Sequence, residues 1–345
     1  MKQTTFVTLA ATAIIGLTAC KGGAASTGGK LIPEQATIMA GIDVGGLLKT
    51  RAYTDNKGQL EKQKEWTEFS AAAKACNLDP EKAISSILLG TDGKANMAAV
   101  ITGDGIGDEK NLTCVADKAK EKNGGKTPFT IADEGGKKVL KMDGGDGVGF
   151  IVDARTVVFA SKGWEAAVKD LVDGKGKPAT DGPNKDLFAR ADQSKHMWAA
   201  GLVPAEAASG AKGLGADPKD FSISLDMGDG LAVKAAVGLA SADQAKDLKK
   251  KADEQLPGMK MIAGMMGIPA KAVETLKVDT KDNQITVEAS MSHDDLKQLQ
   301  DKAGAMLGSM GGGMGGSTPP MQAEPAAPPA PPAEPAAAPA PPATP

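Results

Sequence analysis

Segments in which apolar residues alternate with other residues constrain the fold of this chain more than any other feature. Two of them lie in the second half of the chain: Leu231, Val233, Ala235 and Val237, and Ile285, Val287, Ala289 and Met291. Side chains two residues apart in a strand share one face of a sheet, so each segment predicts a strand with one apolar face. Turn residues such as Asp282-Asn283 precede them, which predicts antiparallel hairpins.

The predicted strands and helices follow a similar order in two halves of the chain. In the first half we predict strands at 38–42, 84–89, 97–102, 129–132, 138–142, 148–152 and 156–160, and helices within 57–74 and at 112–122 and 164–171. In the second half we predict strands at 197–203, 221–225, 231–237, 275–280 and 285–291, and helices at 241–256 and from Ser292 onward. Antiparallel hairpins with helices packed on one side of the sheet indicate an α+β fold. The similar order favours two duplicated halves, and the alternative is one continuous sheet with no ancestral repeat.

These elements divide the chain into segments. The first α+β half spans residues 31–172 and the second spans 187–307, a length that can bury a core without metals or disulfides. Residues 173–186 contain glycines, two prolines and no aliphatic residue larger than Ala, so we predict a linker that buries little. Residues 308–345 are rich first in Gly and Met and then in Pro and Ala, so we predict a disordered tail. Such a tail acts either as a spacer or docking segment toward the cell wall or a partner, or as a passive solubilising segment.

Composition disfavours some classes of ligand. Aromatic residues make up only 3% of the chain, which weakens carbohydrate and base-stacking functions because those ligands usually lie on aromatic faces. The formal net charge is −3 and no basic stripe is present, so we expect no nucleic-acid partner.

The first twenty residues have the pattern of an export signal. Lys2 is followed by a mostly apolar run at 6–16, which is too short to span a bilayer as a mature helix. The run ends in Leu17-Thr18-Ala19-Cys20, which resembles the lipobox of bacterial lipoproteins at all four positions. The alternative is an ordinary secretory signal in which the cysteine falls by chance.

The resemblance implies a signal peptide at 1–19, cleavage after Ala19 and a diacylglyceryl group on the Cys20 sulfur. Residues 20–30 are rich in Gly, Ser and Ala, and we predict a flexible tether there. Asp after the cysteine often retains members of this family in the inner membrane. This chain has Lys21 instead, which favours an envelope protein of the outer membrane over one of the inner membrane.

Catalytic motifs are sparse. The chain has two histidines, of which we expect His293 to be exposed in the first turn of the last helix and His196 to open a strand. Gly41 and Gly46 are spaced like a phosphate-binding loop, but two leucines separate Gly46 from Lys49, where that motif requires adjacency. We therefore expect no enzyme and no cofactor.

Other side chains suggest weaker hypotheses. Asp-Gly segments at 104–108, 143–146 and 226–229 carry carboxylates that suit calcium, but Asp-Gly is also ordinary turn chemistry, which we prefer. Methionines within 259–268 suit either Cu(I), core packing or an adaptable apolar surface, and packing is preferred. With Cys20 lipidated, Cys76 and Cys114 remain, and the sequence leaves open whether they form a disulfide.

These observations favour a membrane-anchored envelope lipoprotein with a non-enzymatic binding or scaffolding role. The alternatives are a periplasmic carrier or sensor of an apolar small molecule, and a hydrolase without a recognisable motif.

Overall fold

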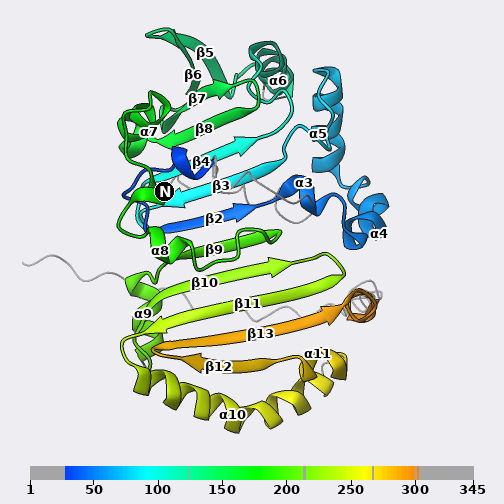
Figure 1. Cartoon of the computed structure of the whole chain (residues 1–345). Coiled ribbons are helices and arrows are strands. Elements are labelled where there is room, and N and C mark those ends of the chain that lie inside the picture. Colours follow the sequence, from blue (N-terminus) through cyan, green and yellow to red (C-terminus); the bar gives the residue numbers. More distant parts are fainter. Residues whose placement is uncertain (1–27, 123, 213–214, 266–267, 300, 303–345) are drawn as a thin grey trace, which may run out of the picture. The chain divides into compact units, whose positions relative to one another are not determined.

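Twelve strands form one antiparallel sheet in the described part of the chain (Figure 1). The structure is a computed structural model, and it describes residues 28–122, 124–212, 215–265, 268–299 and 301–302. The strands are β2 (Ile38–Ile42), β3 (Ser86–Thr91), β4 (Met97–Thr102), β5 (Phe129–Glu134), β6 (Lys137–Met142), β7 (Gly147–Asp153), β8 (Thr156–Ser161), β9 (Met197–Leu202), β10 (Pro218–Asp226), β11 (Gly230–Leu239), β12 (Lys277–Lys281) and β13 (Gln284–Ser292). Their order across the sheet is β12-β13-β11-β10-β9-β2-β3-β4-β8-β7-β6-β5. The α+β class predicted from the alternating segments is confirmed.

The two halves meet at the pairing of β2 with β9, which is symmetric in register. Ile38 pairs with Gly201, Ala40 with Ala199 and Ile42 with Met197, so Ala40 and Ala199 lie at the centre of the pair. From this centre the strand order β2-β3-β4-β8-β7 on one side has the same topology as β9-β10-β11-β13-β12 on the other. The β5–β6 hairpin is the addition in the first half. The repeated order and the single continuous sheet, which we treated as alternatives, therefore occur together.

Helices connect the strands at equivalent places in the two halves. The helices are α3 (Val44–Leu47), α4 (Arg51–Leu60), α5 (Lys64–Ala75), α6 (Glu109–Lys122), α7 (Glu165–Val172), α8 (Lys185–Phe188), α9 (Ala205–Lys212), α10 (Ala242–Met265) and α11 (Ala270–Glu274), with 3₁₀ turns η2 (Gly29–Leu31), η3 (Lys162–Trp164) and η4 (Ala179–Asp181). A further helix begins after Ser292, whose hydroxyl accepts a hydrogen bond from the backbone N–H of Asp295, as the sequence predicts for its first turn. Among the described residues, no helix combines the length and apolar composition that crossing a bilayer requires.

One face of the sheet, which we call the Trp198 face, carries the largest core. Trp198, Leu88, Val100 and Val158 lie side by side on it and are at most 4% exposed. The segment from Leu31 to Ala36, together with α7 and α8, packs over these side chains in the first half. In the second half this face is polar, because Lys234 and Glu288 occupy the equivalent positions and form an ion pair at 2.7 Å.

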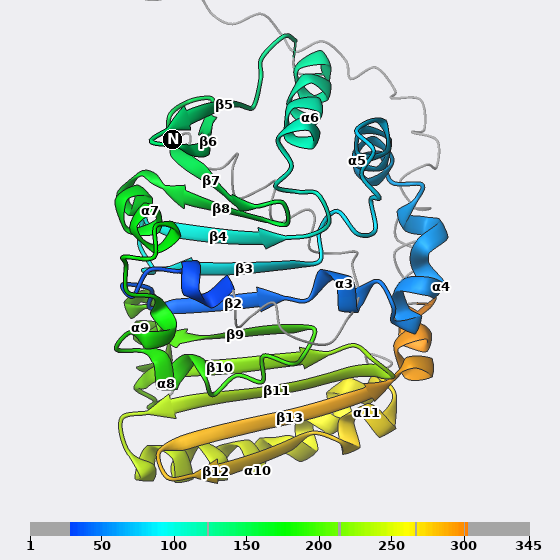
Figure 2. The ribbon, with the colours of Figure 1, turned by 45° about the horizontal axis from the view of Figure 1, so that its top comes forward.

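The opposite face, which we call the Ile223 face, has helices at its two ends. At one end Leu112 of α6 packs with Leu140 and Val157. At the other, Ala245 and Leu248 of α10 pack with Leu239, and α9 also contributes to this cluster. Figure 2 shows α6 near the β5 end of the strand order and α10 at the β12 end. Because α7 and α8 lie on the other face, the expectation that helices pack on one side only is wrong.

Several predicted boundaries differ from the structure. Gly28 to Lys30, assigned to the flexible tether, belong to the packed body, since Gly29 is buried and begins η2. The predicted linker at 173–186 is also packed, because Ala179 is fully buried and Pro178 bridges to Pro33. Its small residues permit this close approach to the N-terminal segment. The tail at 308–345 and the signal at 1–19 lie outside the described residues.

Two helix predictions also need correction. The helical stretch within 57–74 is divided into α4 and α5, with Gln63 in an extended conformation before the second helix. The helix from Ser241 was predicted to end at Leu256, but α10 continues through Pro257 to Met265. Proline removes one backbone hydrogen bond from a helix, and that loss alone does not terminate this one.

Candidate functional site

The middle of the Ile223 face is an apolar surface that the described helices leave uncovered. Its central row consists of residues that lie directly opposite one another on neighbouring strands: Phe159, Ala99, Leu89, Ala40, Ala199, Ile223, Ala235, Val287 and Val278. Every member of the row is apolar, and every member retains partial solvent exposure, with Ile223 and Val287 each 37% exposed. By contrast, the residues opposite one another on the Trp198 face are nearly fully buried in the first half.

The rows on either side of this central row are also largely apolar. Ile42, Ile87 and Ile101 lie in one flanking row, on three adjacent strands, and each is partly exposed. The open region extends over the six strands from β4 to β11, and its dimensions give roughly 400 Å² at about 4.8 Å between strands and about 3.4 Å per residue. The largest exposed apolar patch on a typical soluble monomer is of this size, about 300–600 Å², and it is often functional. We call this region the open apolar face.

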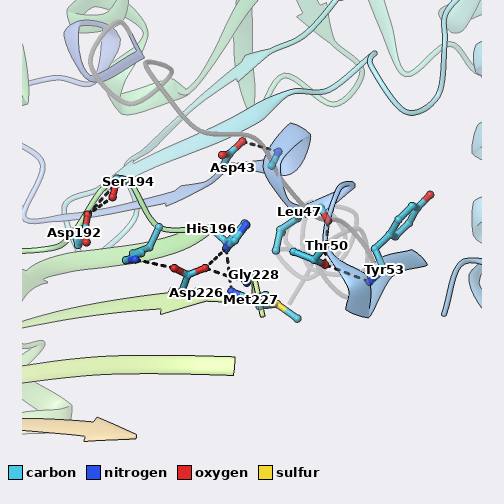
Figure 3. A network of polar contacts seen from close by, with 12 residues as sticks. Asp43, Leu47, Thr50, Tyr53, Asp192, Ser194, His196, Asp226, Met227 and Gly228 are labelled. Atoms are coloured by element: carbon cyan, nitrogen blue, oxygen red, sulfur yellow. Dashed lines mark hydrogen bonds and ion pairs between the residues drawn. The ribbon is translucent and has the colours of Figure 1, made fainter. Parts of the chain in front are cut away.

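A polar network lies at one end of the strands that join the two halves (Figure 3). The Nζ atom of Lys195 and the Nδ1 atom of His196 lie 2.7 and 2.8 Å from the two carboxylate oxygens of Asp226. The backbone N–H of Gly228 donates to the same carboxylate, and that of Met227 lies 2.9 Å from Nδ1 of His196. The network therefore ties the start of β9 to the turn between β10 and β11.

The contacts in this network favour the ionised carboxylate of Asp226 and the protonated ammonium of Lys195. Burial acts to raise the pKa of Asp226, but the hydrogen bonds from Lys195 and the Gly228 backbone outweigh it, so the pKa lies below its usual value. The same hydrogen bond raises the pKa of Lys195. His196 Nδ1 either accepts from Met227 or donates to Asp226, and the tautomer decides which. An ammonium held in a charged pair is a poor general base. The network is therefore better suited to holding β9 against the turn between β10 and β11 than to catalysis.

Asp43 lies near this network, at the end of β2. Its backbone N–H donates to the carbonyl of His196, and its carboxylate accepts from the N–H of Gly46 at 2.9 Å, which caps α3. Burial raises the pKa of Asp43 to about 6, against the opposing effect of Lys49. Gly46 donates to this cap and Gly41 leaves room for Trp198, so each glycine of the segment that had resembled a phosphate-binding loop has a local structural role.

A shallow groove of about 790 Å³ opens beside this network in the second half. Lysines and carboxylates line it in equal numbers: Lys195, Lys234, Lys271 and Lys277, and Asp192, Asp226, Glu274 and Glu288. Ser224 also lines the groove, but its hydroxyl accepts the backbone N–H of Asp192 at 2.8 Å. The described contacts of Ser224 therefore include no base that would activate it as a nucleophile.

The residues singled out from the sequence lie in separate places. Cys20 is outside the described residues. Cys76 and Cys114 form a disulfide between the end of α5 and α6. His293 is not exposed as we predicted, since it is only 8% exposed and its Nε2 lies 2.8 Å from Asp55 of α4. That contact joins residues far apart in sequence, and helix periodicity alone gave no sign of it.

The aspartate turns and the methionines have local roles where they are described. Asp226 accepts the backbone N–H of Gly228 within its own turn, and Gly105 and Gly145 adopt positive φ angles that suit turn glycines. Within the described residues no cluster of three His, Cys, Asp or Glu side chains is arranged to hold a metal. Met261 is 67% exposed on α10 and Ile262 is 54% exposed, so these two side chains present an apolar surface and do not fill a core.

Sequence periodicity could have revealed the open apolar face only in part. It assigns residues to the correct faces of the strands, but it cannot say which helices cover them. The positions of α6 and α10 at the two ends of the sheet supply that information.

Comparisons with known proteins place this chain in no family. No protein-family model matches it, and no curated protein matches it. A solved structure described as "Structure of crystal form I of TP0453" is similar over 79% of this chain and 96% of that chain, with 8% sequence identity and a TM-score of 0.44. That degree of likeness supports no statement about function.

Proposed function

We propose that this chain is a membrane-anchored envelope lipoprotein with a non-enzymatic binding or scaffolding role, and that the open apolar face is its binding surface. The observation that supports the binding role is the in-register row through Ala40, Ala199 and Ile223, which is apolar on every strand and partly exposed throughout. Burying such a surface against a partner releases about 25 cal/mol for each Å² of apolar area removed from water. A face of roughly 400 Å² therefore offers about 10 kcal/mol before the entropic cost of association, which suits a small interface.

The lipobox motif and the disulfide support the envelope location. Leu17-Thr18-Ala19-Cys20 matches the lipobox of bacterial lipoproteins, and Lys21 favours the outer membrane. A disulfide such as Cys76–Cys114 persists in oxidising compartments and is rare in the cytosol. Mass spectrometry of the native protein tests the anchor. We expect an N-terminal peptide that begins at Cys20 and carries fatty chains, and an unmodified thiol or an uncleaved leader would contradict it.

Substitutions that introduce a charged side chain test the binding surface. Ile223→Lys places an ammonium in the middle of the open apolar face, whereas Ala232→Lys places one at an exposed position on the other face of the adjacent strand. We expect Ile223→Lys to lower the binding of an apolar fluorescent dye to the purified protein, with Ala232→Lys unchanged. Equal dye binding by both variants would contradict a binding role for this face.

The runner-up is a periplasmic carrier or sensor of an apolar small molecule. The open face favours it in one respect, since an acyl chain or similar ligand suits aliphatic side chains. However, two grooves in the described part of the chain are open and lined with charged residues, whereas carriers usually enclose their ligand. A co-purifying apolar molecule that raises the melting temperature, and whose binding survives Ile223→Lys, would favour the carrier.

The hydrolase alternative has weaker support. Ser224 and Lys195 line the same groove, but each is engaged with a different partner.

For the tail, crosslinked pull-down from membranes with and without residues 308–345 tests docking to an envelope protein or the cell wall. Identical recovered proteins would reject a docking role for the tail.

A further inference from the structure

The two edges of the twelve-stranded sheet are protected to different degrees. Helix α10 runs beside β12 at one edge, and Lys277 and Lys281 at the two ends of β12 are exposed (Figure 1). A covering helix and exposed lysines are common protections of an edge strand against pairing with another sheet. The other edge is β5, which contains no lysine and no proline. The less protected edge therefore belongs to the β5–β6 hairpin, the addition in the first half.

The geometry of this hairpin determines which backbone groups of β5 point away from the sheet. Its turn, Gly135-Gly136, has positive φ angles at both residues, so the flanking pair of Glu134 and Lys137 is the hydrogen-bonded pair that closes the turn. Hydrogen bonds to β6 then recur at every second residue of β5, and the bond from the N–H of Asp143 to the carbonyl of Pro128 lies in the same phase. The backbone groups that point to the outer edge are those of Phe129, Ile131 and Asp133.

These outward groups are available to another strand in the described part of the chain. Outside the pairing of β5 with β6, no backbone hydrogen bond within the described ranges involves Phe129, Ile131 or Asp133. The side chains of Phe129 and Ile131 pack with Leu112 of α6, which places that helix over the Ile223 face of the strand. Pro128 does not interrupt the edge, because its backbone faces β6. An edge strand of this kind is a template for pairing with another chain.

We propose that two copies of this chain pair through β5, antiparallel and related by a two-fold axis, so that one sheet continues through both molecules. The backbone allows the axis to pass any residue of the strand, because outward groups then face outward groups. Only an axis at Thr130 places Lys126 opposite an acidic residue, which is the partner's Glu134. Symmetry gives this pair twice, and opposite charges directly across two strands favour pairing.

The segment is complementary to itself in this register, which is why the occupant is a second copy. Lys126 is exposed and lies in no ion pair within the described ranges. Glu134 contacts Lys141 at 2.8 Å, and a carboxylate has the capacity to accept from a second ammonium. The pairing extends over residues 126–134 of both copies, which is longer than the five residue pairs that join β2 to β9. The contact also repeats the symmetric strand pairing that joins the two halves of one molecule.

A cysteine on the axis tests this pairing directly. The two copies of residue 130 form a non-hydrogen-bonded pair with Cα atoms about 4.5 Å apart, a separation that a disulfide bridges. In the full-length chain with Cys20 changed to Ser, we expect Thr130→Cys to give a disulfide-linked dimer under mild oxidation. Thr127→Cys is the matched control, because the two copies of residue 127 lie roughly 20 Å apart along the strands. Equal crosslinking of the two variants, or none at 130, would overturn the proposal.

Sedimentation equilibrium measures the pairing in solution. Thr130 is exposed on the strand, and Thr130→Lys sets two ammonium groups opposite each other on the axis. We expect the dissociation constant of the dimer to rise about five-fold, because like charges directly opposite each other destabilise strand pairing. Ala232→Lys adds the same charge at an exposed position on β11 and should leave the constant unchanged. A parent chain that stays monomeric at every concentration, or equal effects of the two variants, would contradict pairing through β5.

Reversing the charges tests the register. Lys126→Glu and Glu134→Lys each bring like charges together across the axis, so each should weaken the dimer. The double variant restores opposite charges and should return the dissociation constant to that of the parent chain. A purely structural effect of either substitution would not be rescued in this way, so a double variant as weak as the single variants would overturn the register and the proposal with it.

Discussion

Removing the disulfide between α5 and α6 tests how the helices over the first half are held. Cys76 and Cys114 are separated by 38 residues, and Cys76 is only 3% exposed. A crosslink that closes a loop of this length lowers the entropy of the unfolded chain, and the loop-closure relation gives about 4 kcal/mol at 25 °C. Cys76→Ala with Cys114→Ala removes the crosslink without burying a polar group. We therefore expect the free energy of unfolding to fall by about 4 kcal/mol in the double variant.

Equilibrium urea denaturation of the soluble body, with Cys20 changed to Ser, measures this difference. For a body of this size, at about 2.1 cal/mol/K of unfolding entropy per residue, the same loss lowers the melting temperature by roughly 7 °C. Chemical reduction of the parent protein should reproduce most of the effect, whereas the double variant should not respond to reductant.

A control on the same pair of helices distinguishes the crosslink from ordinary contacts. Glu68 of α5 and Lys122 of α6 form an exposed ion pair at 3.3 Å. Replacing both with Ala should cost less than about 1 kcal/mol, because exposed ion pairs contribute little. A loss below about 1 kcal/mol for the cysteine variant, or free thiols at both positions in the native protein, would refute the loop-closure reasoning.

Two further predictions concern the seam between the halves. A Cβ atom at Gly41 would lie 2.2 Å from Nε1 of the buried Trp198, so Gly41→Ala should destabilise the protein by about 2 kcal/mol. Gly58→Ala, in open space on α4, should instead stabilise it by about 0.5 kcal/mol in the same urea assay, and equal effects would contradict the clash. The pKa of Asp43 is about 6 in the folded state, against an ordinary value of 3.8. Between these two pH values the folded state binds more protons than the unfolded state. The free energy of unfolding should therefore fall as the pH rises from about 4 to 6. Asp43→Asn keeps a hydrogen-bond acceptor for α3 and should remove this dependence of the unfolding free energy on pH. The same dependence in urea titrations of the variant from pH 4 to 7.5 would argue against the raised pKa.

Much of the fold follows from local sequence patterns. The strand at Met97–Thr102 matches its predicted bounds, and most predicted hairpins differ from the observed strands by only a few residues. Alternation within a strand depends on neighbouring residues, so a single sequence reveals it. The repeated order was visible for the same reason. The pairing of β2 with β9 was not predicted, because contacts between distant strands depend on strand order and leave no local periodicity.

The binding surface was harder to predict than the strands that form it. Ala40 and Ala199 look like ordinary core residues in the sequence, and only the arrangement of α6 and α10 at the two ends of the sheet leaves them partly exposed. The expectation for His293 failed for a related reason. Its partner Asp55 comes from a helix in the other half, and a helix position that is exposed in isolation became buried through that contact.

The register of the sheet has a mechanical consequence. The chain enters β2 at Ile38, which is level with Gly201 and Ile285, and it leaves β13 at Ser292, at the opposite end of the strands. Tension applied between these two points therefore acts obliquely, over about 24 Å along the strands and about 19 Å across them. Its component along the strands loads the hydrogen bonds from β2 to β13 in shear. The pairing of β2 with β9 joins five residue pairs, fewer than the nine that join β11 to β13, so the seam between the halves is the pairing that should separate first under such a load.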